Sequence, residues 1–173
     1  MTKKTLPIDS VCQALDAMEG TAGIGKNLFE SISRLTPAVS VELIIKSPDQ
    51  KSNLLTWRDD ELYGPGWHVP GGVVRFKETL TSRVEKVLKN EIGVPASKIE
   101  GPTGFHEIFN DQRDIRGHFI SFVFLIELIG APPDKYRAKE CAPKTGCWQW
   151  FTECPHNLIS NQKILAGYIN NGK

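Results

Sequence analysis

The stretch from Pro70 to Val94 constrains the fold of this 173-residue chain more than any other part of it. It opens with Pro-Gly-Gly, which is a turn signal, and continues through a short polar connection into a predicted helix that ends at Gly93. Apolar residues recur in this helix with a helical period and predict one buried stripe, formed by Leu80, Val84, Val87 and Leu88.

Glu91 is the residue in this helix that most needs a partner. Glu78 and Thr79 lie where a helix start favours acceptors and negative charge, whereas Glu91 lies beside the apolar stripe in the last turn. A carboxylate at the edge of a buried face needs a compensating group. A hard cation with oxygen ligands would serve, because the carbonyl of Gly71 or Gly72 could complete its shell. The alternative is a solvated residue at a helix end.

The same stretch resembles the Nudix box, G-x5-E-x7-R-E-U-x-E-E-x-G-U, where U is a bulky aliphatic residue. Its spacing is kept without insertion or deletion, and its fixed positions are occupied by Gly72, Glu78, Leu88, Glu91, Gly93 and Val94. Lys86 stands where the family has arginine, and Val87 and Asn90 stand where it has metal-binding glutamates. The resemblance implies the Nudix fold, an α/β/α sandwich around a mixed β-sheet. In that family Glu78 is more often structural than metal-binding.

A box with a single carboxylate at a metal position is similar to the GDP-mannose mannosyl hydrolase branch of this family. That branch keeps the last glutamate and one Mg²⁺, and it attacks the sugar carbon instead of phosphorus. The order of predicted elements from Asn27 to Phe151 also resembles the branch. The resemblance implies that Gly71 and Glu91 hold one Mg²⁺, that Arg58 contacts the diphosphate and that Glu42 meets the nucleoside. Without a ligand, Arg58 and Glu42 would be ordinary surface residues at a strand end and on an outer strand face.

The general base is the open point of this hypothesis. Lys144 and Thr145 occupy the positions from which the branch takes a histidine base and a metal-binding glutamine, and neither suits those tasks. Glu140 in the same loop is our candidate base, with Asp134 as a more distant alternative. His106 and His118 lie in or near predicted central strands, where a histidine is usually a hydrogen-bonded structural residue.

We therefore expect a Mg²⁺-dependent Nudix hydrolase of a nucleotide sugar, with GDP-mannose or GDP-glucose as the leading substrate and GDP and the free sugar as products. One rival is a Nudix pyrophosphohydrolase that attacks phosphorus. The other is a non-catalytic Nudix module that senses a nucleotide, which the residues at positions 87, 90 and 145 favour. The sequence does not decide among bases, sugars or these alternatives.

Composition and charge exclude other classes of function. The formal net charge is +1, and no basic run is interleaved with aromatic residues, so we expect no nucleic-acid partner. We expect no signal peptide and no membrane segment, because the N-terminus lacks an apolar core and the longest apolar run, from His118 to Gly130, reads as a buried strand. The four cysteines show no Cys-x-x-Cys spacing, so reduced thiols are favoured over a zinc site. We expect a cytoplasmic homodimer.

Two domain segments follow from the order of elements. Residues 1–26 form an N-terminal extension with a short helix from Asp9 or Ser10, and residues 27–173 form the Nudix domain. The run Gly20–Asn27 nearly matches a phosphate-binding loop, but no strand precedes it, so a glycine-rich linker is favoured. The remaining predicted helices are 28–35, one opening near Pro155, and 162–169. The predicted strands are 39–45, 54–58, 67–69, 105–109, 118–129 and 147–151.

Overall fold

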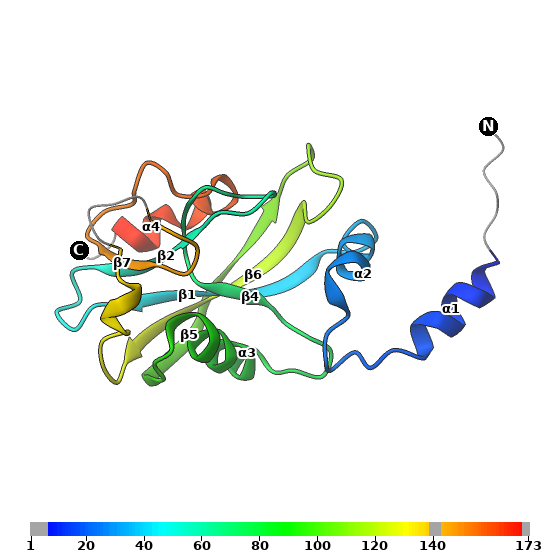
Figure 1. Ribbon diagram of the computed structural model, residues 1–173, viewed down its shortest axis with the longest axis horizontal. Coiled ribbons are helices and arrows are strands. Elements are labelled where there is room, and N and C mark those ends of the chain that lie inside the picture. The colour runs from blue at the N-terminus through cyan, green and yellow to red at the C-terminus, as the bar shows by residue number, and fades with distance from the viewer. Residues whose placement is uncertain (1–6, 139–142, 171–173) are drawn as a thin grey trace.

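A mixed sheet of seven strands forms the middle of the computed structural model, which describes residues 7–138 and 143–170 (Figure 1). The strands are β1 Ala38–Lys46, β2 Asn53–Arg58, β3 Gly66–His68, β4 Gly71–Val73, β5 Ala96–Phe109, β6 His118–Leu128 and β7 Trp148–Phe151. The path through the sheet is β3-β2-β1-β6-β5, with β4 paired to β1 and β7 paired to β2. Because β1 runs parallel to β6 and antiparallel to β2 and β4, the sheet is mixed, as predicted.

Helices cover both faces of this sheet. The helical elements are α1 Ile8–Asp16, α2 Gly25–Ile32, α3 Leu80–Val87, the π-helical turn η1 Leu88–Ile92, the 3-10 turns η2 Asp134–Tyr136 and η3 Ser160–Leu165, and α4 Ala166–Asn170. The α3–η1 segment packs on one face of the sheet, and η3 with α4 packs on the other. The predicted α/β/α sandwich is confirmed.

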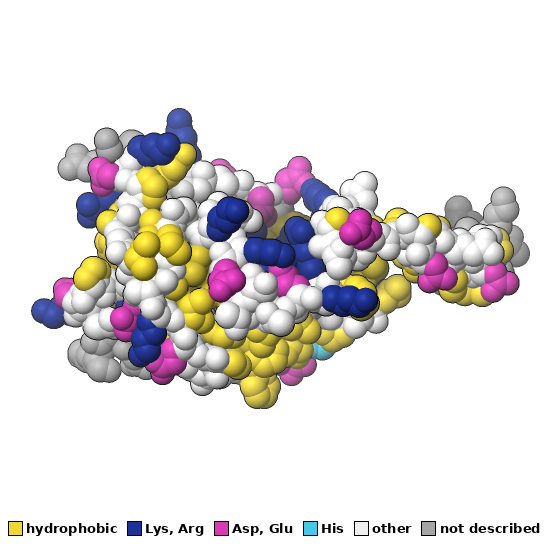
Figure 2. All heavy atoms as spheres, turned by 90° about the horizontal axis from the view of Figure 1, so that it is seen from below, with side chains coloured by type: hydrophobic (Ala, Val, Ile, Leu, Met, Phe, Trp, Pro, Cys, Tyr) yellow, Lys and Arg dark blue, Asp and Glu magenta, His cyan; other side chains and the backbone are white. Residues whose placement is uncertain are grey.

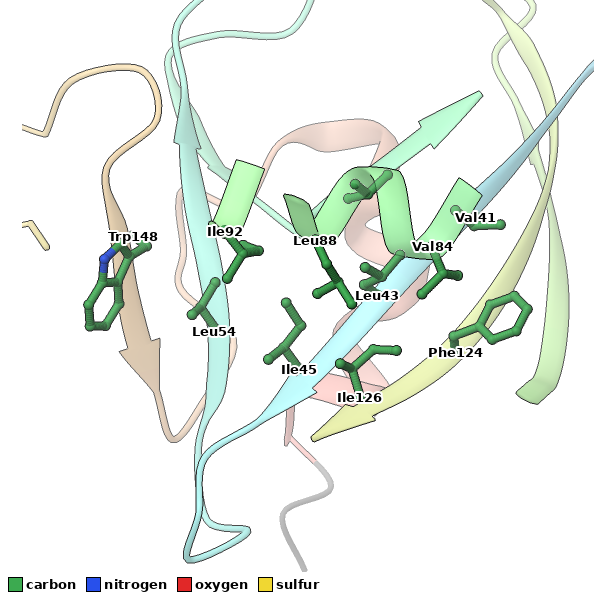
Figure 3. Close-up of a cluster of buried hydrophobic side chains, with 11 residues drawn as sticks. Val41, Leu43, Ile45, Leu54, Val84, Leu88, Ile92, Phe124, Ile126 and Trp148 are labelled. Carbon is green, nitrogen blue, oxygen red and sulfur yellow. The ribbon is translucent and has the colours of Figure 1, made fainter. Parts of the chain in front are cut away.

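The central strand β1 separates two hydrophobic cores. Its alternate side chains point to opposite faces, so Val41 and Leu43 join the core under α3, and Ile44 joins the core under α4. Figure 3 shows the core under α3, in which Val41 and Leu43 meet Val84 of α3 and Phe124 of β6. Glu42 lies between Val41 and Leu43 and therefore faces the α4 side of the sheet.

The helix of the box begins and ends as its sequence predicts. The Thr79 hydroxyl accepts a hydrogen bond from the Ser82 N–H at 3.1 Å, which caps the first turn. Gly93 closes the helix in the left-handed conformation, with φ +76°, and its N–H donates to the Leu88 carbonyl at 2.8 Å. The unpredicted feature is that the last turn, η1, is a π-helix, which places Glu91 beyond the α-helical stripe.

Several predicted boundaries are wrong. The Pro-Gly-Gly run is more than a turn, because its glycines open strand β4, which pairs with Ser40–Glu42 of β1. The predicted strand 105–109 is only the end of β5, and α2 begins at Gly25, inside the proposed linker. No helix opens near Pro155, where the chain forms a turn before η3.

The N-terminal helix α1 has no buried residue. It lies to one side of the sandwich in Figure 1. Among the described residues, no helix combines the length and apolar character needed to cross a membrane.

Candidate active site

Glu42 lies at the base of a small cavity of about 90 Å³ and is buried. Gln162 of η3 holds it, because its Nε2 donates to Glu42 Oε2 at 2.7 Å and to the Val69 carbonyl at 3.0 Å. The Gln162 Oε1 accepts from the Val69 N–H at 2.7 Å, so the amide is fixed on three sides. Burial raises the pKa of Glu42 to about 8, although its hydrogen bonds with Gln162 and Ser121 oppose that shift.

Gly71 is required beside Glu42 because there is no space for a side chain. A Cβ at this position would lie 2.6 Å from Glu42 Oε2 and 2.6 Å from the Val41 carbonyl oxygen. The Pro70 carbonyl accepts from the Leu43 N–H, and the Val74 N–H donates to the Val39 carbonyl. Since hydrogen-bonding direction alternates along a strand, the Gly71 carbonyl points away from β1. It is therefore available to a ligand.

Glu91 lies in a second, larger cavity of about 770 Å³. Its nearest cationic candidate among the described residues is His68, whose Nε2 lies 3.9 Å from Glu91 Oε2. Desolvation raises the pKa of Glu91 to about 7, and the charge of Arg58 opposes this. The side chain is still 35% exposed, so water in the cavity limits the effect. Burial also lowers the pKa of His68 to about 4, so this imidazole is neutral at pH 7.

Arg58 and His68 line both cavities and so join them into one site. Arg58 is the last residue of β2, and its Nε lies 2.7 Å from Asp60 Oδ2. Its guanidinium lies over the Tyr63 ring, 5.4 Å from the centroid. The ion pair with Asp60 involves Arg58 Nε, and the residue lines both cavities. Its charge acts on both Glu42 and Glu91. A guanidinium that lines both cavities is well placed to bind a diphosphate there.

Glu78 has a different environment from Glu91. Its carboxylate accepts from the Arg75 N–H at 2.9 Å and from Arg83 Nε at 2.7 Å, and it pairs with Lys86 Nζ at 2.8 Å. These bonds connect the loop after β4 to helix α3. Burial alone would raise the pKa of Glu78, but these donors outweigh it and lower the pKa to about 2. Each carboxylate oxygen of Glu78 thus already has a cationic partner, Arg83 at Oε2 and Lys86 at Oε1.

The other predicted positions divide into three groups. Lys144 and Thr145 line the cavity that contains Glu91, whereas Glu140 lies outside the described residues. Val87 is buried against Gly72, whose Cβ would lie 3.0 Å from Val87 Cγ2, and Leu88 lies in the α3 core. His106 pairs with Tyr168, and His118 pairs with Glu107, so neither lines the two cavities.

Sequence reasoning missed four residues of the site: His68, Tyr63, Arg116 and Gln162. Gln162 is 120 residues from Glu42 in the chain. Only the fold brings them together, and no local pattern marks Tyr63, Arg116 or Gln162. His68 had a signal, because it lies directly between the buried Trp67 and Val69 and so had to face the opposite side of β3.

Comparison with known proteins defines the class of this chain. The NUDIX domain family matches residues 36–154. The chain therefore belongs to the Nudix hydrolase family. A solved structure of a MutT NUDIX hydrolase from Burkholderia pseudomallei shares the fold, with a TM-score of 0.59, 19% identity and coverage of 78% of this chain and 98% of that chain.

Two relatives have higher sequence identity. The low-salt glycan biosynthesis protein Agl8 of Haloferax volcanii is 34% identical over 120 residues, which cover 67% of this chain and 75% of that protein. An ADP-ribose pyrophosphatase of Methanocaldococcus jannaschii is 35% identical over 135 residues, which cover 78% of this chain and 75% of that protein.

Proposed function

We propose that this protein is a Mg²⁺-dependent hydrolase of a nucleotide sugar, of the GDP-mannose or GDP-glucose type, that releases the sugar and an intact nucleoside diphosphate. The observation that carries the proposal is that the box keeps one carboxylate at a metal-binding position, Glu91, and that no Lys or Arg of the described residues forms an ion pair with it. Val87 is buried, Asn90 is neutral, and Glu78 is occupied by Arg83 and Lys86. Glu91 is the box carboxylate that remains for a metal ion.

The residues present fit one divalent ion. No group of three or more His, Cys, Asp or Glu side chains converges on a metal position within residues 7–138 and 143–170. Glu91 and the Gly71 carbonyl would hold Mg²⁺, which commonly takes one or two carboxylates and completes its shell with water and substrate phosphates. When bound, the ion supplies positive charge to the diphosphate.

The side chains then have separate tasks. Glu42, fixed by Gln162, hydrogen-bonds the nucleoside in the small cavity. Arg58 at the junction of the cavities binds the diphosphate and stabilises the charge that develops on the leaving nucleoside diphosphate. The water that attacks the anomeric carbon needs a base, for which we retain Glu140. Tyr136 and Lys144, which lie four residues before and four residues after it in the sequence, line the Glu91 cavity.

Product analysis in ¹⁸O-labelled water tests which bond breaks. The protein would be incubated with Mg²⁺ and a panel of nucleotide sugars that includes GDP-mannose, GDP-glucose and ADP-ribose. We expect the label in the free sugar and an unlabelled nucleoside diphosphate, because a site with one carboxylate is poorly equipped to activate water against phosphorus. Label in a phosphate, or a nucleoside monophosphate among the products, would contradict this assignment.

Attack at phosphorus is the second candidate. It is favoured by the similarity to the Methanocaldococcus jannaschii protein, which is named an ADP-ribose pyrophosphatase. The same panel separates it, because ADP-ribose would then yield AMP and ribose 5-phosphate.

A nucleotide sensor is the third candidate function. It is favoured by Lys144 and Thr145 in the cavity, and it predicts nucleotide binding with no turnover of any member of the panel.

We also infer that two copies of the chain associate through apolar surfaces left open in the monomer. Helix α1 has nine residues and exposes Ile8, Val11 and Leu15. Isolated helices shorter than about 12–15 residues are marginal in water, so α1 needs a surface to pack on. Strand β5 exposes Phe105 and Phe109 on the face of the sheet beyond α3. Figure 2 shows hydrophobic side chains gathered on this side of the sandwich and along the N-terminal helix.

Exchange of α1 helices between two copies would cover both surfaces in a closed, symmetric pair. Light scattering after size-exclusion chromatography tests this, with Leu15→Asp and Phe105→Asp each expected to convert a dimer into a monomer. Ile164→Asp, at an exposed apolar position on η3, is the control and should leave the dimer intact. A monomeric wild-type protein, or dimers in both variants, would contradict the inference. The boundary of the N-terminal extension at residue 26 stays a prediction.

A further inference from the structure

Three guanidinium groups surround the ring of Tyr63 at the small cavity. The distances from Cζ to the ring centroid are 5.4 Å for Arg58, 4.4 Å for Arg113 and 5.3 Å for Arg116. Arg58 and Arg116 also line the cavity that contains Glu42, as does Tyr63. We call Arg58, Arg113, Arg116 and Tyr63 the arginine cluster.

Acceptors among the described residues neutralise only part of the positive charge of the arginine cluster. Asp60 pairs with Arg58, and its pKa is lowered by the N–H groups of Leu62 and Tyr63 and by the charge of Arg58, although burial opposes this. Arg113 Nη1 and Arg116 Nε are buried and have no hydrogen-bond partner among the described residues. Buried guanidinium nitrogens without acceptors are costly. An anionic ligand at the cavity would offset that cost.

Arg116 is held in place by two other parts of the chain, the α2 region and the loop after β2. Its N–H donates to Ser33 Oγ, after α2, at 3.0 Å, and its carbonyl accepts from the Tyr63 hydroxyl at 3.1 Å. Its guanidinium lies 5.5 Å from the centroid of the Phe29 ring in α2, so it contacts two aromatic rings, those of Phe29 and Tyr63. Its backbone has φ +52°, a left-handed conformation that is unfavourable for a non-glycine residue.

A strained residue that is fixed from several directions is typical of a functional position. A cation–π contact alone would stabilise the loop, but it would not require two hydrogen bonds to a strained backbone. The planar fork of arginine suits the oxygen atoms of a phosphoryl group better than any other side chain does.

We propose that Arg116 is a phosphoryl-binding residue of the site, and that it binds the diphosphate of the substrate together with Arg58. Arg113 acts as a positioning residue, because it contacts Tyr63 and the Leu62 carbonyl but does not line the cavity. This inference rests on the proposed function only in assuming a substrate with a diphosphate. The proposal adds a substrate contact from the β5–β6 loop. Helix α2, which supports that loop, lies outside the matched family region.

Calorimetric binding of inorganic pyrophosphate, GDP and ADP tests the proposal without turnover. The measurements would use the Glu91→Gln background, so that metal binding does not mask the side chains. We expect Arg116→Gln to weaken pyrophosphate and diphosphate binding at least about 10-fold, and Arg116→Lys to weaken it less, because lysine keeps the charge and loses the fork. Binding should also depend less on salt in Arg116→Gln. Lys98→Gln removes one positive charge on β5, where Lys98 pairs with Glu100, and serves as the control.

Three results would overturn the proposal. These are no binding of any of the three probes, unchanged binding in Arg116→Gln, and an equal loss in Lys98→Gln. Thermal unfolding midpoints close to that of the background protein would show that the variants are folded, and Arg116→Lys, the more conservative change, decides if Arg116→Gln is not. Failure of the proposed function is seen separately, as absent turnover of nucleotide sugars by the wild-type protein, and leaves the pyrophosphate result readable.

Discussion

The two ends of the box helix carry glutamates with opposite surroundings. Glu78 lies at the start, is almost fully buried and is ion-paired with Arg83 and Lys86, and its pKa is about 2. Glu91 lies at the end, with neutral His68 as its nearest partner, and its pKa is about 7. The first carboxylate stabilises the folded protein by itself, whereas the second is satisfied only by something added. A box position therefore becomes a candidate ligand when the fold leaves it unpaired.

Loss of activity in Glu91→Gln is the largest effect we expect from this contrast. The amide keeps the size of the side chain but removes the one carboxylate at a metal-binding position of the box, so Mg²⁺-dependent turnover should fall on the order of 100-fold or more. Steady-state assays with a nucleotide sugar measure it, and circular dichroism checks the fold. Glu85→Gln, at an exposed position of α3, is the matched control. Activity within a few-fold of wild type in Glu91→Gln would remove Glu91 from the metal site.

Glu78→Ala should act on stability instead. It leaves the buried Arg83 without its carboxylate, and breaking a buried pair in this way costs about 3 kcal/mol or more. Urea denaturation at pH 7 measures the loss. Because the pKa of Glu78 is lowered on folding, its contribution is present above about pH 4.5 and is lost as the pH falls toward 2. The difference in stability between wild type and variant should shrink over that range, and a constant difference would contradict the ion-pair account.

Val87→Glu restores a glutamate of the family motif, yet we expect no gain in activity. Val87 is buried against Gly72 in the α3 core, and an unpaired carboxylate there costs about 1–3 kcal/mol. Denaturation curves and Mg²⁺ titrations measure the two consequences. An equally stable variant that binds additional Mg²⁺ would show that this face of α3 can open to the site.

The smallest expected effect has the opposite sign to that of Glu78→Ala. Because folding raises the pKa of Glu91, its ionisation opposes folding between about pH 4.5 and pH 7, and the cost remains above pH 7. Metal-free Glu91→Gln should therefore be more stable than metal-free wild type at pH 8, by about 1 kcal/mol once partial exposure is allowed for. Addition of Mg²⁺ should stabilise the wild type alone. A less stable variant under metal-free conditions would contradict the comparison.

Local sequence patterns predicted the parts of this molecule that depend on neighbouring residues. The helix of the box, its cap at Thr79 and its stop at Gly93 follow from spacing and residue type. Strand β4 was missed because its two glycines are poor strand formers, and only pairing with β1 makes them extended. The helix predicted near Pro155 does not form, because the preference of proline for a helix start is local and does not by itself produce a helix.

The partners of the site residues could not be predicted in the same way. The face of β1 that Glu42 takes decides which partners surround it, and its bond to Gln162 exists only once η3 has packed on the sheet. The arginine cluster likewise joins the end of β2, the loop after it and the β5–β6 loop. The sequence marks Arg58 through the family resemblance, but it gives no signal for Arg113 or Arg116.

Strand β1 also limits how this protein can change over evolutionary time. Every side chain from Ser40 to Ile45 is buried. Val41, Leu43 and Ile45 belong to the core under α3, and Ile44 belongs to the core under α4. A larger residue at Leu43 would require a smaller side chain elsewhere in the core under α3, and a larger residue at Ile44 would require one in the core under α4. Sequence drift along this strand therefore requires paired substitutions with distant partners. Helix α1, in which no residue is buried, can vary position by position as far as the monomer is concerned.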